Sequence, residues 1–146
     1  MTAILHKSRH TLAMAALIAG ILTAGAGMAT AGERKANLSG DQEVPPVQTS
    51  ATGTGAIIVE DDKSVKGTIT TFGIKGTSAH IHEGAAGKNG PDLIALKKTS
   101  DGEWSVPSGA KLTDAQYDAY KAGNLYVNIH SEAHPSGELR GQLKNR

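Results

Sequence analysis

Alternation of apolar and polar residues runs through most of the chain after residue 36 and predicts short β-strands. In the segment 53–60, for example, Ile57 and Val59 share one face, as the two-residue period of a half-buried strand requires. Clusters of Gly, Pro, Asp and Asn separate the segments. Strands are predicted at 36–44, 53–60, 65–74, 77–82, 93–97, 103–106, 125–130 and 138–143. The pattern predicts an all-β domain, an antiparallel β-sandwich or barrel.

One segment departs from this alternation and predicts a short helix at about 114–122. Thr113 is a suitable N-cap, and Gln116 three residues later completes a capping box. Lys121 suits the last turn of a helix, and Gly123 suits the left-handed residue that follows it. The expected fold is therefore a β-sandwich or barrel with one short helix.

The segment 1–31 has the layout of a secretory signal peptide. Lys7 and Arg9 precede an uncharged run at 11–30 that is rich in Ala, Leu, Ile and Gly, and the sequence Ala-Thr-Ala at 29–31 forms a cleavage signal. A retained membrane anchor is the alternative, because the run is almost long enough to span a bilayer. Its many Gly and Ala residues and the cleavage signal favour export. We expect a secreted or periplasmic protein with no membrane attachment after cleavage.

The expected mature domain, 32–146, carries 13 basic and 14 acidic residues, so its net charge is close to zero. It shows no basic stripe, and the whole chain has one Trp, three Tyr and one Phe, which excludes a nucleic-acid partner. The chain has no Cys, which excludes disulfides and thiolate ligands. A metal site in this domain must be built from nitrogen and oxygen ligands.

The sequence His80-Ile81-His82 is the first candidate for such a site. Residues two apart in a strand share a face and lie roughly 6.5–7 Å apart along it. Because metal–imidazole bonds are about 2 Å long, rings that reach inward from these two positions can meet at one ion. A pair of solvated surface histidines is the ordinary alternative for this short motif.

The second candidate group lies near the C-terminus. Asn128 and His130 share the polar face of the strand at 125–130, and Arg140 shares the polar face of the strand that follows. If the two strands form a hairpin, these side chains lie on one face, and His134 in the connection can fold back over it. A hydrogen-bonded edge histidine and a solvated turn histidine are the alternatives for His130 and His134.

Three sequence blocks then connect the chain to a known family. They are DQEVPPV, SAHIHEGAAGKNGP and LTDAQYDAYKAGNLYVNIHSEAHPSGELRGQL, and together they resemble the CHRD domain over about residues 36–143. The resemblance implies an immunoglobulin-like β-sandwich with the architecture of copper-zinc superoxide dismutase. It also implies copper binding and superoxide dismutase activity. His80, His82 and His130 fall on the family's HIH and NxH positions, whereas His134 occupies a variable position.

Four imidazoles without thiolate or thioether ligands favour copper, with zinc as the alternative. The sharper hypothesis is a copper-only superoxide dismutase with His80, His82, His130 and His134 as ligands. Arg140 is the candidate for attracting the superoxide anion, and a cross-strand ion pair with Glu138 or Glu132 is its alternative role.

Two other functions stay open at this point. One is non-catalytic copper binding, storage or delivery, and the other is an extracellular interaction module without metal. Superoxide or copper is the expected small ligand, and a homodimer is an option for a small domain without cysteines.

Overall fold

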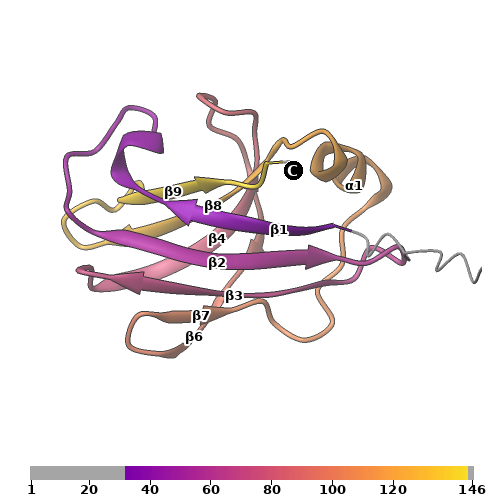
Figure 1. Ribbon diagram of the computed structural model, residues 1–146, viewed down its shortest axis with the longest axis horizontal. Coiled ribbons are helices and arrows are strands. Elements are labelled where there is room, and N and C mark those ends of the chain that lie inside the picture. The colour runs from indigo at the N-terminus through magenta and orange to yellow at the C-terminus, as the bar shows by residue number, and fades with distance from the viewer. Residues whose placement is uncertain (1–31, 145–146) are drawn as a thin grey trace, which may run out of the picture.

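Strands that bury alternate residues build two antiparallel sheets in the computed structural model, which describes residues 32–144 (Figure 1). One sheet has the strand order β1-β2-β3-β7-β6, and the other has the order β5-β4-β8-β9. The strands are β1 (Glu33–Leu38), β2 (Thr52–Val59), β3 (Val65–Phe72), β4 (Gly76–Glu83), β5 (Asp92–Ala95), β6 (Lys97–Ser100), β7 (Glu103–Ser105), β8 (Leu125–Ser131) and β9 (Leu139–Gln142). The predicted all-β sandwich is confirmed. The predicted signal peptide, 1–31, lies outside the described residues.

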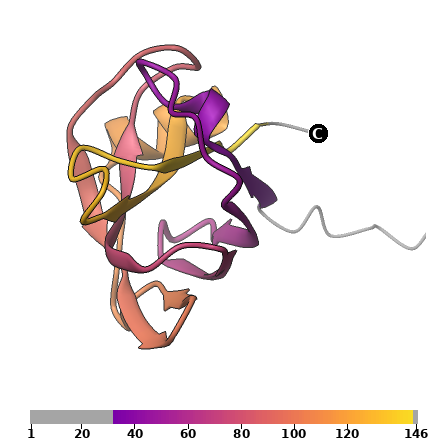
Figure 2. The same cartoon turned by 90° about the vertical axis from the view of Figure 1, so that its left-hand side faces the viewer.

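The hydrophobic core lies between the two sheets. Ile57 and Ile69 enter it from the five-stranded sheet, and Ile81, Val127 and Leu139 enter it from the four-stranded sheet, each with at most 1% of its surface exposed. Figure 2 shows the orange and yellow strands of one sheet facing the purple and magenta strands of the other. Each such side chain contributes about 1.5–3 kcal/mol by leaving water, which lets a domain without disulfides hold its sheets together.

The strand predicted at 93–97 is confirmed only as far as Ala95, because the chain changes sheets within the predicted segment. β5 ends at Ala95 in the four-stranded sheet and β6 begins at Lys97 in the five-stranded sheet. Leu96 lies buried between them and donates its backbone N–H to the carbonyl of Ala79. Ile94 and Leu96 keep the two-residue period of burial across the crossing, so the hydrophobic pattern gives no sign of it.

The first strand also ends earlier than predicted, at Leu38 instead of residue 44. A 3₁₀ turn at Gly40–Gln42 (η1) follows it, and a Cβ on Gly40 would lie 2.3 Å from the carbonyl oxygen of Val47. The turn runs along the edge strand β9, where Gln42 accepts a hydrogen bond from the backbone of Gln142 at 3.2 Å. Glu43 then reaches over the outer face of the four-stranded sheet and accepts a hydrogen bond from Asn128. This segment therefore covers part of the face on which the histidines lie.

The predicted helix is confirmed as α1 (Asp114–Lys121). Thr113 and Gln116 form both hydrogen bonds of the capping box, and Gly123 follows the helix with φ of 80°. Within residues 32–144, no helix has the length and apolarity needed to cross a membrane.

Candidate metal centre

The outer face of the four-stranded sheet collects the polar side chains of β4, β8 and β9. Ala79 and Ile81 point into the core from β4, so His80 and His82 point the other way, as predicted. Cross-strand pairing then sets the neighbours on this face: His80 with Asn128 and Arg140, His82 with Tyr126 and Gln142, and Ser78 with His130. The register of β4 and β8 thereby brings the three histidines together on one face of the sheet.

His80, His82 and His130 form one cluster, in which each residue offers a ring nitrogen and these nitrogens lie within 4.8 Å of one another. The Nδ1 atom of His80 and the Nε2 atom of His130 are 3.2 Å apart. The ring of His82 lies 5.7 Å from that of His80 and 6.4 Å from that of His130, measured between centroids. All three side chains are half-buried, so the cluster lies close to the surface of the domain.

Backbone carbonyl groups orient two of the three rings. His82 Nδ1 lies 3.1 Å from the carbonyl oxygen of Gly90, and His130 Nδ1 lies 2.8 Å from that of Pro135. A carbonyl oxygen only accepts hydrogen bonds, so each Nδ1 carries the proton and each Nε2 keeps its lone pair. The two Nε2 atoms therefore have the protonation state of a metal-binding imidazole.

The residues fit a mononuclear metal ion. The Nε2 atom of His82 is buried and has no hydrogen-bond partner, which is costly for a polar atom unless something binds it. Two nitrogens bound to one ion at about 2.0–2.1 Å and at angles of about 90–110° lie roughly 2.8–3.4 Å apart. The 3.2 Å between His80 and His130 falls in that range. Without an ion, the same two nitrogens share a hydrogen bond.

The protonation of the cluster also suits a cationic ligand. Burial lowers the pKa of His82, and burial together with neighbouring His130 lowers the pKa of His80. Neutral imidazoles bind metal ions, whereas imidazolium ions do not, so the lowered pKa values keep these ligands available at neutral pH. Asp92 on β5 lies opposite His82, and its negative charge acts on both histidines.

Comparison with known proteins identifies the family. The CHRD domain family model matches residues 34–143, from the first residues of β1 to the residue after β9. The chain belongs to the CHRD domain family. No curated protein and no solved structure matches it. The resemblance in sequence is thus confirmed, and the histidine cluster lies inside the matched CHRD domain.

His134 of this CHRD domain does not join the cluster. It lies in the turn between β8 and β9, and the ring-nitrogen cluster among the described residues contains only the other three histidines. Its backbone N–H donates to Ser131 Oγ, and its carbonyl accepts from Ser131 and Gly137. The turn therefore uses the main chain of His134, and the predicted role of its side chain as a fourth ligand gains no support from the geometry.

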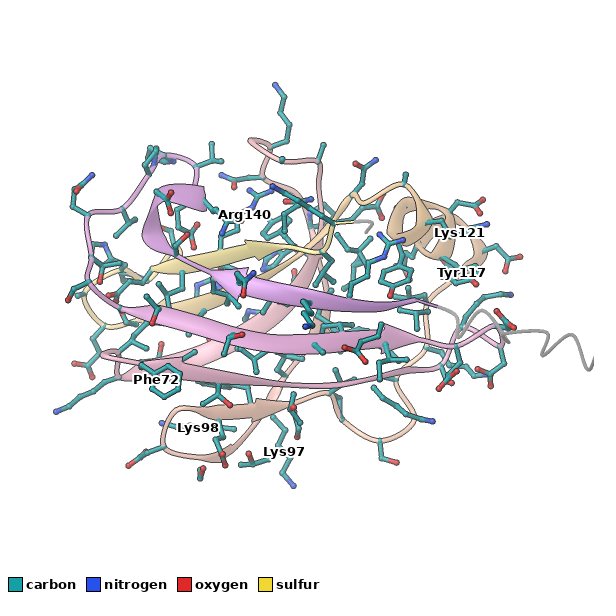
Figure 3. The ribbon with its side chains drawn as sticks, in the orientation of Figure 1. Phe72, Lys97, Lys98, Tyr117, Lys121 and Arg140 are labelled. Carbon is teal, nitrogen blue, oxygen red and sulfur yellow. The ribbon has the colours of Figure 1, made fainter. Side chains whose placement is uncertain are left out.

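Arg140 lies apart from the histidines, on the other side of Tyr126. Its guanidinium group stacks 3.6 Å above the ring of Tyr126, and the ring of His82 is parallel to Tyr126 at 4.9 Å. Because β4 and β9 flank β8 on opposite sides, His82 and Arg140 occupy opposite faces of Tyr126. Figure 3 shows Arg140 beneath the loop that joins β4 to β5.

Neither predicted role of Arg140 matches this placement. The ring of Tyr126 lies between the guanidinium group and His82, so a superoxide ion at the histidines would not contact Arg140. Glu138 is engaged elsewhere, since Thr49 donates to it at 2.7 Å and Ser131 also donates to it. Arg140 instead donates to the carbonyl of Ala85 at 2.9 Å. It holds the loop 84–91 against the sheet.

Gly90 is a residue of the candidate site that the sequence analysis missed, whereas Tyr126 lies on the polar face that the alternation at 125–130 predicts. The carbonyl of Gly90 orients His82, and its N–H donates to the hydroxyl of Tyr126 at 3.2 Å. The peptide of Gly90 therefore links the ring of His82 to the ring stacked on it. The only signal in the sequence is the glycine-rich loop 84–90, which has no side-chain motif because the contacts are made by the main chain.

Glu43 is a further buried acid on this face that the sequence analysis missed. It is 7% exposed, and its Oε1 accepts a hydrogen bond from the side chain of Asn128. Burial raises the pKa of Glu43 to about 7, although the charge of Arg140 and the hydrogen bond from Asn128 oppose this rise. The carboxyl group is thus part protonated at neutral pH.

Replacing Glu43 by glutamine is expected to remove a pH-dependent loss of stability. The unfolded chain ionises Glu43 near its ordinary pKa of 4.5, whereas the folded protein holds the proton up to about 7. Folding takes up a proton in this window, so the free energy of unfolding of the wild type falls as pH rises through it. The expected loss is about 1–2 kcal/mol, less than the full shift implies because solvent screens part of it.

Urea unfolding of wild type and Glu43→Gln between pH 4 and pH 8 measures this difference. The free energies of unfolding of the two proteins should differ least at the acid end. As the pH rises to about 7, the wild type should lose stability relative to the variant. Curves that stay parallel over the whole range would show that Glu43 titrates normally in the folded protein.

Proposed function

We propose that this CHRD domain is an exported protein that binds one copper ion through His80, His82 and His130. The observation that carries the proposal is the Nε2 atom of His82, which is buried beside two further imidazole nitrogens and has no hydrogen-bond partner. Export rests on the signal-peptide pattern of residues 1–31.

Copper is the ion that this ligand set favours. Three neutral nitrogen donors suit copper and zinc, and the affinity order of divalent metals places copper above zinc at such a site. The charges around the cluster also favour a cation, because Asp92 acts on His80 and His82 and no Lys or Arg of the described chain does. Zinc is the alternative ion for the same three ligands.

Metal analysis and EPR of the purified exported chain test the proposal. After loading with copper and removal of free metal, about one copper per chain should remain, with hyperfine structure from nitrogen ligands in the Cu(II) spectrum. A protein loaded with an equal mixture of copper and zinc should retain copper in preference to zinc. A protein that retains no metal, or a His80→Ala/His130→Ala double variant that binds copper as the wild type does, would refute the three-histidine centre.

Superoxide dismutation at this centre is the second candidate. It is favoured by the partial exposure of the three histidine side chains, which keeps the cluster close to the surface, where a small anion would approach it. A bound copper ion would supply one-electron redox chemistry. The chain's own residues would orient the ligands through Gly90 and Pro135. Arg140, the predicted cation for attracting superoxide, does not serve it here, because Tyr126 lies between its guanidinium group and His82.

Stopped-flow superoxide decay separates the two candidates. A dismutase would consume superoxide catalytically when loaded with copper and would lose this activity in the His80→Ala/His130→Ala variant. A copper-loaded protein with the nitrogen EPR signal but no faster decay than free buffer is a binding, storage or delivery protein. Azide sensitivity of the decay would confirm that the anion reaches the ion.

A further inference from the structure

A second candidate site lies on the same face of the sheet, separated from the histidines by Tyr126. It is a cleft of about 400 Å³ between the segment 41–46 and the loop that joins β4 to β5. Arg140 and Gln142 of β9 line it from the sheet side. None of the three histidines borders this cleft, so it is distinct from the proposed copper centre.

The cleft is lined by two ionisable side chains and one amide that are almost fully buried. Arg140 is 1% exposed, Gln142 is 6% exposed and Glu43 is 7% exposed, yet all three line the cleft. Side chains of this kind are rarely buried unless they are paired. Their presence in the wall of one cleft points to a ligand with complementary polar groups.

The charge of Arg140 has no carboxylate in direct contact. Its guanidinium donates to neutral acceptors only, namely Ala85 O at 2.9 Å, Gln142 Oε1 at 2.9 Å and Asn89 Oδ1 at 3.4 Å. Among the ion pairs of the described chain, none includes Arg140. Glu43 is the acid whose charge acts on Arg140, and while Glu43 holds its proton the buried guanidinium has no counter-charge, which is costly. An anionic group in the cleft would supply one and remove that cost.

Glu43 complements such an anion instead of repelling it. One of its oxygens accepts from Asn128, and among the described residues no side chain donates a hydrogen bond to the other. Since burial raises the pKa of Glu43 to about 7, its carboxyl can keep a proton and donate it in a hydrogen bond to an anionic oxygen. A protonated carboxyl group and a guanidinium group together recognise a carboxylate.

The rest of the cleft wall indicates what the carboxylate is attached to. Val44, Pro46 and Ala86 supply apolar surface, and Asp41 and Lys144 supply one charge of each sign. The apolar residues suit a short aliphatic chain. Arg140, Lys144 and Asp41 together carry a net charge of one positive unit, which suits a ligand with a single negative charge.

We propose that this cleft is a binding site for a short aliphatic carboxylate, held by Arg140 and Glu43 with its apolar part against Val44, Pro46 and Ala86. The site is a separate function of the domain and does not depend on copper. The carboxylate can belong to a free acid or to the C-terminus of a peptide, and both present the same chemistry to the cleft.

NMR titration of the isotope-labelled protein at pH 6.5 with butyrate tests the site. Saturable shifts are expected at the amides of Ala86, Gly87 and Gln142, and not at His80 or His130. Butyramide, which has the same shape without the charge, should leave these amides unchanged. A parallel titration with acetyl-alanyl-valine shows whether the cleft also accepts a peptide C-terminus; tighter binding of either compound supports the proposal and identifies the source.

Two variants probe the two halves of the cleft. Arg140→Gln should abolish butyrate binding, and Ala86→Phe, a change at an exposed loop residue, should fill the cleft and weaken binding at least tenfold. Ala86→Phe leaves Arg140 in place, so it tests the site even if Arg140→Gln fails to fold. Absence of saturable shifts in the wild type, equal shifts with butyramide, or full binding by Ala86→Phe would each overturn the proposal. Copper retention is measured separately, so failure here leaves the histidine centre untouched.

Discussion

Replacement of His82 by alanine is expected to lower the affinity for copper by more than about 100-fold, beyond the 10–100-fold range typical of residues that only support a ligand. The change removes the one histidine nitrogen of the described residues that is buried without a hydrogen-bond partner. It also removes the ring that Gly90 and Tyr126 hold in place. Competition with a chelator of known copper affinity gives the dissociation constants of wild type and variant.

His134→Ala is the matched control for this prediction. Both substitutions delete an imidazole from a half-buried position. Because His134 lies outside the cluster, its loss should change the copper affinity by less than about threefold, within the range of surface substitutions. Equal losses from the two variants would show that four histidines bind the ion and that the turn at 131–138 rearranges around it.

Replacement of Gly90 by alanine is expected to damage both the fold and the copper site. A Cβ at this position would lie 1.7 Å from the carbonyl oxygen of Glu83, a contact that the backbone must move to relieve. Overpacking of this kind costs about 1–3 kcal/mol or more. The same movement withdraws the carbonyl that orients His82, so we expect copper affinity to fall by about 10–100-fold as well.

Gly87→Ala in the same loop controls for the change itself. A Cβ on Gly87 would have no atom within 4 Å, although its φ of 77° makes alanine strained there. The expected cost is about 1–2 kcal/mol of stability with unchanged copper affinity. Urea unfolding and chelator competition on both variants separate the two effects. A Gly90→Ala protein with wild-type copper affinity would show that the Gly90 carbonyl has no part in positioning His82.

The elements that the sequence predicted well are those whose signal is local. The capping box at Thr113 and Gln116 defines the start of α1 from four consecutive residues. The alternation around Ile81 and Val127 reflects burial on one face of each strand, and it correctly placed His80 and His82 on the outer face.

The features that escaped prediction depend on contacts between distant segments. The crossing at Leu96 leaves the period of burial intact, so only the partner strands reveal it. The position of Arg140 depends on Tyr126, 14 residues earlier in the chain, and on the loop at 84–91, which pack over it and leave it 1% exposed. Alternation correctly gave the face of the sheet but not what covers that face.

The carbonyl groups of Gly90 and Pro135 that orient His82 and His130 have a consequence for how such sites can be recognised and built. Since any residue supplies a backbone carbonyl, the two orienting loops leave no fixed signature in the sequence apart from a glycine where space is short. Searches for related centres should therefore compare loop conformation around paired histidines. A designer who transfers this site to another sandwich must transplant the two loops as rigid pieces along with the three imidazoles.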